Sequence, residues 1–398
     1  MKPTQIQSKT VGPGDRFLFA RILGCAVLLC FVGSASASAV FDIYVLRKGD
    51  GVAVTNDMQA HHIDHFSGSA DSVTLTNSWA APSTDPDTRI TQGGDFSTYS
   101  QLTRSVDGNY LTFMGRSAEV GGSGGDTDHV VGMFNLRTQT FDTSTRVLAS
   151  EVDQRGGRGF RSGISTDGND IWFTGRNQRA WHTTLGSDTA TDIARNWQYN
   201  RIGIHGGDLF ISRRAGTTHG LHRWDGLPTD EPTDEVARFA DLGTGWDSDN
   251  GQYGDFAFVR DYLFITSTND GPDDISVYAR GDGPDEWNRM TGPGQTLTES
   301  IEGMPMFSSA IDRGDHVQLF YSNDGGGDNN ALYSVMFDLE NEAFGTPIHL
   351  ADAGEGYGFA GVVAVPEPST YALLFGLGTL GVVLVIRRRR RPGKPDTV

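Results

Sequence analysis

The side chains best suited to chemistry in this sequence are carboxylates grouped in Gly- and Asn-rich segments at 247–251, 269–274 and 323–328. Carboxylate and carbonyl oxygens are the ligands that Ca²⁺ prefers, and the first segment imitates the start of a calcium loop, although it lacks the third alternate acid and the distant Glu. Asp and Asn also form turns often, and this role alone would explain their presence in these segments. Ca²⁺ is therefore a candidate ligand, beside a purely structural role, and no other cofactor is indicated. The candidate ligands are Asp247, Asp249, Asp270, Asp273, Asp324 and Asp328.

Two groups of histidines offer a second type of site. On a strand, His61 and His65 would share one face and could grip a metal ion between them. His219 and His222 form a similar pair in an expected loop. A solvated strand face is the favoured interpretation of the first pair, with a metal site as the alternative, and the loop pair is interpreted in the same way.

Arg161 and Arg201 recur at equivalent positions of an internal repeat. If that repeat builds a propeller, both arginines lie beside inner strands and can bind an anionic ligand at the channel mouth. Pairing with the many Asp residues of the chain is the structural alternative.

Catalytic motifs are absent from the sequence. It contains no H-E-x-x-H or P-loop pattern, and its G-x-S-x-G match at 121–125 is a run of glycines around Ser123. Both cysteines, Cys25 and Cys30, lie in the N-terminal apolar run, so a processed chain would have no cysteine nucleophile. The sequence favours a protein without catalysis but does not decide the matter.

The charge of the chain is strongly negative and unevenly distributed. The formal net charge is −18 for 398 residues. Without residues 1–39 and 366–398, the remaining 22 basic and 47 acidic residues give −25. Such a surface repels nucleic-acid phosphates, so nucleic acid is excluded as a partner.

Residues 1–39 have the order of a secretory signal peptide. Arg16 and Arg21 precede a short apolar run at 22–32, and small residues then offer A-x-A cleavage sites after Ala37 or Ala39. The pattern predicts export and cleavage by signal peptidase. An N-terminal membrane anchor is the weaker alternative.

The C-terminal end, 366–398, predicts a membrane anchor. An apolar run at 371–386 would form a transmembrane helix of about 24 Å, slightly short of a hydrocarbon core of about 30 Å. The basic cluster that follows it would hold this end in the cytoplasm and leave the body outside. The motif before the run is Val365, Pro366, Glu367 and Pro368, and the cluster after it is Arg387, Arg388, Arg389, Arg390 and Arg391.

This order of motif, short apolar helix and arginine cluster resembles a PEP-CTERM sorting signal. The resemblance implies recognition by an exosortase, with cleavage near Pro366 to Pro368. In that family the signal accompanies an exopolysaccharide matrix, which makes exopolysaccharide or another envelope protein an expected partner. A plain single-pass anchor is the alternative.

The body, 40–365, is predicted to be all-β. A repeated unit of strand, Asp/Gly turn and strand has turns near 108, 168, 207, 261 and 315. Units of this length are typical of a β-propeller. We expect six blades, or seven if 40–95 forms its own, with the strands at 41–47, 62–66 and 73–79 joining 358–364 to close the ring. A pair of β-sandwiches or a β-helix fits the spacing less well.

The segment that begins Phe41-Asp-Ile-Tyr-Val resembles the opening strand of a group of secreted bacterial propeller-like proteins, and this resemblance supports the fold without implying an activity. The sequence favours a non-catalytic binding propeller at the cell surface or in the matrix. A secreted propeller enzyme, such as a glycosidase, lyase or other hydrolase, and a Ca²⁺-dependent structural protein are the alternatives.

Overall fold

The structure of the protein is a computed structural model. It describes residues 41–52, 57–93, 101–125, 127–152, 160–175, 179–195, 199–213, 220–230, 237–238, 252–268, 274–283, 286–297, 306–323 and 330–366. The predicted signal peptide, the apolar run at 371–386 and the arginine cluster lie outside these residues. Within the described ranges, no helix has the length and apolar character needed to cross a bilayer.

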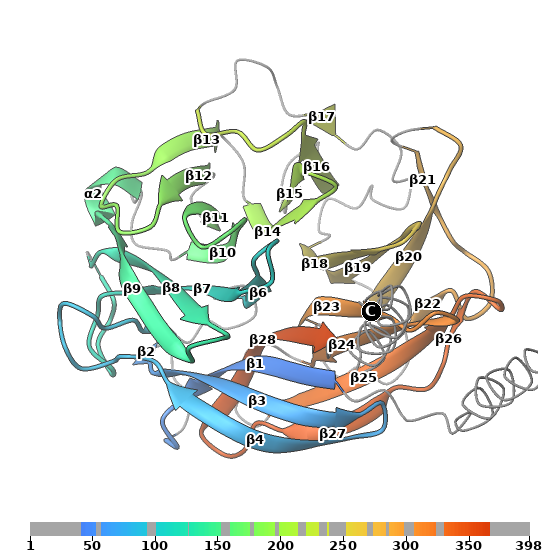
Figure 1. Ribbon diagram of the computed structural model, residues 1–398, viewed down its shortest axis with the longest axis horizontal. Coiled ribbons are helices and arrows are strands. Elements are labelled where there is room, and N and C mark those ends of the chain that lie inside the picture. The colour runs from blue at the N-terminus through green and yellow to red at the C-terminus, as the bar shows by residue number, and fades with distance from the viewer. Residues whose placement is uncertain are drawn as a thin grey trace, which may run out of the picture. The chain divides into compact units, whose positions relative to one another are not determined.

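Six antiparallel sheets, numbered here as blades 1 to 6, surround a common axis (Figure 1). Blade 1 contains β28 (Tyr357–Pro366), β1 (Phe41–Gly49), β3 (His61–Ser69) and β4 (Ser72–Ala80). Blade 2 contains β6 (Thr103–Arg104), β7 (Tyr110–Arg116), β8 (His129–Asn135) and β9 (Thr140–Val147). Blade 3 contains β10 (Phe160–Ser165), β11 (Asp170–Gly175), β12 (Arg179–Thr184) and β13 (Thr191–Arg195).

Blade 4 contains β14 (Tyr199–His205), β15 (Asp208–Arg213), β16 (Gly220–Trp224) and β17 (Ala237–Arg238). Blade 5 contains β18 (Gln252–Val259), β19 (Tyr262–Thr268), β20 (Asp274–Arg280), β21 (Trp287–Arg289) and β22 (Thr296–Leu297). Blade 6 contains β23 (Met306–Asp312), β24 (His316–Ser322), β25 (Ala331–Asp338), β26 (Ala343–Phe344) and β27 (Ile348–Asp352). A small pair, β2 (Met58–Gln59) and β5 (Gln92–Gly93), and one short helix, α2 (Ala149–Val152), complete the described elements.

The expected Asp/Gly turns join the first and second strands of blades 2 to 6. In blade 3 the turn places Gly168 at a φ of 93°, a conformation that a residue with a Cβ rarely adopts. A Cβ at Gly168 would also lie 2.6 Å from the ring of Tyr110 in blade 2. The glycine therefore allows both the tight turn and the close packing of two neighbouring blades.

The ring closes through blade 1, which combines the two ends of the described chain. The inner strands are β28, β6, β10, β14, β18 and β23, and each contacts the next around the axis, with β23 contacting β28 (Figure 1). β28 comes from the C-terminal end, whereas β1, β3 and β4 come from the N-terminal end. The fold is therefore a six-bladed propeller with the predicted closure, and residues 40–95 do not form a seventh blade.

The hydrophobic core is divided among the six interfaces between neighbouring blades. Each of the six buried clusters takes its residues from two adjacent blades. Trp172, Trp181 and Trp224 are buried in two of these clusters, where they pack blades together. This burial holds the inner strands in place around the axis.

Candidate functional site

The inner strands share an irregularity at one level of the axis. In blades 3, 4 and 5 the register against the second strand shifts between Phe160 and Ser162, between Tyr199 and Ile202, and between Tyr253 and Phe256. The residues at these bulges include Arg161, Arg201 and Asp255. A bulge turns a side chain away from the regular alternation of the strand, and here it places three charged residues at the same level of neighbouring blades.

Arg201 of blade 4 makes the main polar contacts at this level. Its Nε lies 3.3 Å from Oδ1 of Asp255 in blade 5. Its Nη1 donates to Oε1 of Gln101 at 3.2 Å, and its Nη2 donates to the carbonyl of Leu102 at 3.4 Å. Both acceptors precede β6 of blade 2, so one buried guanidinium connects three blades.

Asp255 is fully buried, and its burial changes the pKa of its carboxyl group. Burial raises the pKa of its carboxyl to about 7, although the positive charge of Arg201 lowers it. Neither carboxylate oxygen accepts a hydrogen bond from a described residue. A carboxyl that titrates near neutral pH beside a guanidinium can exchange a proton under physiological conditions.

Arg161 occupies the equivalent bulge in blade 3. It is 0% exposed, and its Nη1 donates to the carbonyl of Tyr199 in blade 4 at 3.1 Å. The equivalence of Arg161 and Arg201 that the repeat indicates is visible in the register. Arg201 pairs with an aspartate, as the structural alternative expects, whereas the contact of Arg161 is with a backbone carbonyl. The binding of an anion by these two arginines stays a prediction.

A cavity of about 390 Å³ lies on the axis, beside Arg201. All six inner strands or the residues that directly follow them contribute to its wall, and of the described residues that line it none is acidic. Its volume lies within the range of cavities that hold small molecules. Its lining includes Ile164, Gly203, Phe256, Phe258, Ser309 and Ala364.

Two basic side chains line this cavity near the ends of their inner strands. Arg104 is half-buried, and its Nε donates to the carbonyl of Gly108 at 3.1 Å, while its Nη1 and Nη2 have no acceptor among the described residues. His205, the last residue of β14, stacks on Phe258 with ring centroids 4.3 Å apart. Burial and the charge of Arg280 lower the pKa of His205, so the imidazole is neutral at pH 7. The sequence interpretation missed both residues, although each lies beside a predicted turn.

The predicted metal sites are only partly covered by the structure. The six candidate aspartates and His219 lie outside the described residues, so Ca²⁺ binding stays a prediction. His61 is fully buried, whereas His65 bonds to Asp42 and Thr76 on the neighbouring strands. His222 is buried in β16. The described part of the chain holds no cluster of three or more His, Cys, Asp or Glu side chains arranged for a metal ion.

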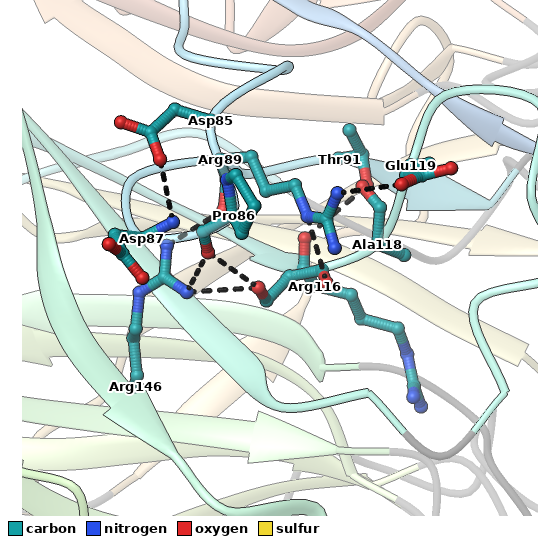
Figure 2. A network of polar contacts seen from close by, with 10 residues as sticks. Asp85, Pro86, Asp87, Arg89, Thr91, Arg116, Ala118, Glu119 and Arg146 are labelled. Carbon is teal, nitrogen blue, oxygen red and sulfur yellow. Dashed lines mark hydrogen bonds and ion pairs between the residues drawn. The ribbon is translucent and has the colours of Figure 1, made fainter.

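A second polar network fixes the segment between blades 1 and 2 (Figure 2). Nη1 of Arg146 donates to the carbonyl of Pro86 at 2.7 Å and to Oγ of Ser117 at 2.9 Å, and its Nη2 donates to the carbonyl of Arg89 at 3.3 Å. Thr91 pairs with Arg116 through two backbone hydrogen bonds. The terminal nitrogens of Arg146 are held by acceptors within the fold, so we assign this network a structural role.

A model of the PEP-CTERM protein-sorting motif matches residues 364–390. This chain therefore carries that motif, which implies an exported protein that is targeted to the cell surface and processed by an exosortase. No curated protein matches the sequence.

Several solved structures are similar to this chain at low identity. The periplasmic gluconolactonase of Pseudomonas aeruginosa is 11% identical with a TM-score of 0.46, over 83% of this chain and 100% of that chain. A protein of unknown function from Bacteroides caccae is 9% identical with a TM-score of 0.45, over 82% of this chain and 99% of that chain. A chain of a nidogen–laminin complex is 10% identical with a TM-score of 0.44, over 82% of this chain and 98% of that chain. These similarities concern the fold alone.

Proposed function

Since residues 364–390 are a PEP-CTERM sorting motif, we propose that the chain is exported by a cleaved signal peptide at 1–39 and held by a membrane helix at 371–386 until an exosortase processes it. The propeller body is then displayed on the surface or in the extracellular matrix, where it binds a ligand without catalysis. Exopolysaccharide or another envelope protein is its proposed partner.

The observation that supports binding is the composition of the axial cavity. A glycosidase of the common type needs two carboxyl groups about 5–10 Å apart at its site. The described residues that line the cavity supply none, and they offer basic and hydroxyl side chains together with aliphatic, aromatic and glycine surfaces. A wall with a few polar groups among apolar surfaces suits the binding of a polar ligand, and without a carboxyl pair it does not suit this acid–base chemistry.

The test uses the full-length chain purified in detergent and the host's own extracellular polymer. We expect the polymer to bind and no reducing ends to be released in the same mixture. The variant Ala310→Leu, which reduces the cavity, should weaken binding, with its melting temperature as the check on folding. Binding that is unaffected by this change would place the ligand elsewhere and would contradict the proposal.

One observation favours an enzyme as the second candidate. Asp255 has a pKa of about 7 and lies next to Arg201, which lines the cavity. Asp255 does not itself line the cavity, so in a hydrolase of this kind it would act by positioning Arg201 at the substrate; the enzyme would release product from the polymer, and Asp255→Asn would lower this release while leaving binding intact. Release that is unchanged in Asp255→Asn would exclude this mechanism.

A further inference from the structure

The axial cavity differs in charge from the rest of this acidic chain. The formal net charge of the chain is −18, yet the charged residues among those that line the cavity are Arg104 and Arg201, with His205 as a third basic group. The guanidinium of Arg201 is already held by Asp255, Gln101 and Leu102. Arg104 is therefore the cation that can take a ligand.

The terminal nitrogens of Arg104 are prepared for an oxyanion. The hydrogen bond from its Nε to the carbonyl of Gly108 fixes the plane of the guanidinium. Asp107 is the acid whose charge influences Arg104, and its carboxylate already accepts hydrogen bonds from Ser105 and from the backbone and side chain of Asn109. A planar fork with two donors that no described residue occupies matches a carboxylate, which it can bind with two parallel hydrogen bonds.

The rest of the wall is suited to a carbon skeleton that carries hydroxyl groups. The neutral imidazole of His205 has no hydrogen bond to a described residue on either ring nitrogen, so it can donate to one hydroxyl and accept from another. Ile164, Ile204 and Phe258 supply apolar surface. Arg104 and His205 come from blades 2 and 4, so they approach the cavity from different sides of the axis.

We propose that the axial cavity binds a polyhydroxylated carboxylate of the uronic-acid class, with the carboxylate held by Arg104 and a hydroxyl held by His205. This inference rests on the proposed binding function and assigns the chemical class of its ligand. A neutral sugar of the same shape leaves the Arg104 donors unpaired, so the cavity discriminates by charge.

The test compares D-glucuronate with D-glucose, which differ at a single carbon, by calorimetric titration of the full-length chain in detergent. We expect glucuronate to bind at least about tenfold more tightly, as one charge-assisted pair provides. Arg104→Gln should remove this preference, and Arg104→Lys, which keeps the charge but loses the fork, should retain part of it. Arg137→Gln removes the same charge from an exposed turn of blade 2 and should change nothing.

Equal affinities for the two sugars, or a preference that survives Arg104→Gln, would overturn the proposal. If Arg104→Gln does not fold, the proposal is still tested by Arg104→Lys and by the ratio of the glucuronate and glucose affinities of the unmodified chain. If neither sugar binds while the host polymer does, the uronic-acid proposal fails and the binding function survives. If nothing binds, both fail.

Discussion

Phe41 and Pro366 lie opposite each other in the antiparallel pair of β1 and β28, so both ends of the described body meet at the same end of blade 1. Asp42 and Val365 form the next pair inward. Pro366 is also the first residue of the Pro-Glu-Pro motif. The sorting motif therefore begins inside the strand that closes the ring, without a linker between them.

This arrangement predicts where processing occurs. A protease needs an extended and accessible substrate, whereas the residues before Pro366 are paired in the sheet, so we expect the processed chain to end at or after Pro366. The intact mass of the protein released from cells gives the position directly. A terminus before Val365 would mean that β28 is removed from the ring, and would contradict the prediction.

The same pair of strands predicts the limit of truncation. A chain that ends at residue 356 lacks β28, so it exposes the edge of β1 and leaves the rest of the cluster that Phe359 and Val362 complete without these partners. We expect it to be insoluble or to lose cooperative unfolding, while a chain that ends at 366 keeps both. Circular dichroism on heating distinguishes them, and equal melting curves would argue against closure by β28.

The buried pair of Arg201 and Asp255 predicts a large effect of one substitution. Arg201→Met leaves the buried carboxyl of Asp255 without its cation, which should lower the free energy of unfolding by about 3 kcal/mol. Arg223→Met, which breaks a pair with the exposed Asp225, should cost less than about 1 kcal/mol. Urea denaturation measures both. Similar losses would show that the burial of the first pair contributes little.

Asp255 also predicts a dependence of stability on pH. Its pKa in the folded protein, about 7, lies above that of the unfolded chain, near 4. Its contribution to stability is therefore complete below about pH 4 and is lost as the pH rises through 7. Asp255→Asn should remove this loss, so its melting temperature should fall less between pH 4 and pH 7 than that of the unmodified chain. Parallel curves would show that Asp255 does not titrate there.

His129 predicts a dependence of stability on pH with the opposite sign, in which stability is lost as the pH falls. It is buried, its ring centroid lies 4.1 Å from that of Phe160, and burial with the charge of Arg116 lowers its pKa well below the ordinary value. Its contribution to stability is present above about pH 6.5 and is lost as the pH falls towards the lower pKa of the folded state. His129→Phe should therefore weaken the loss of stability between pH 7 and pH 5. An unchanged loss of stability in His129→Phe would contradict the prediction.

The network around Arg146 predicts a local effect (Figure 2). Arg146→Met removes the donors to Pro86, Arg89 and Ser117, which should cost about 1–3 kcal/mol and loosen the segment between blades 1 and 2. Limited proteolysis should then cut within 81–93 sooner than in the unmodified chain. Arg137→Met, in an exposed turn of the same blade, should leave the rate of cutting unchanged.

Local patterns in the sequence determined much of the fold. Asp107-Gly108 and Asp167-Gly168 mark turns whose backbone conformation depends on adjacent residues, so they are visible without the structure. The number of units and the partial unit at the C-terminal end predicted six blades and the closure of blade 1. The sorting motif is a continuous stretch, and for that reason it was also identified from the sequence.

The candidate site was decided only by the tertiary structure. Arg201 meets Asp255 and Gln101 because the ring brings three blades together around one axis, and no spacing along the chain encodes this. The repeat indicated that Arg161 and Arg201 are equivalent, whereas the place of Asp255 at the corresponding bulge of blade 5 is visible only in the register of the sheet. The functional value of Arg104 likewise depends on its exposure to a cavity that all six inner strands build. Turns and sorting signals are local, whereas burial, pKa and the lining of a cavity depend on residues that are distant in sequence.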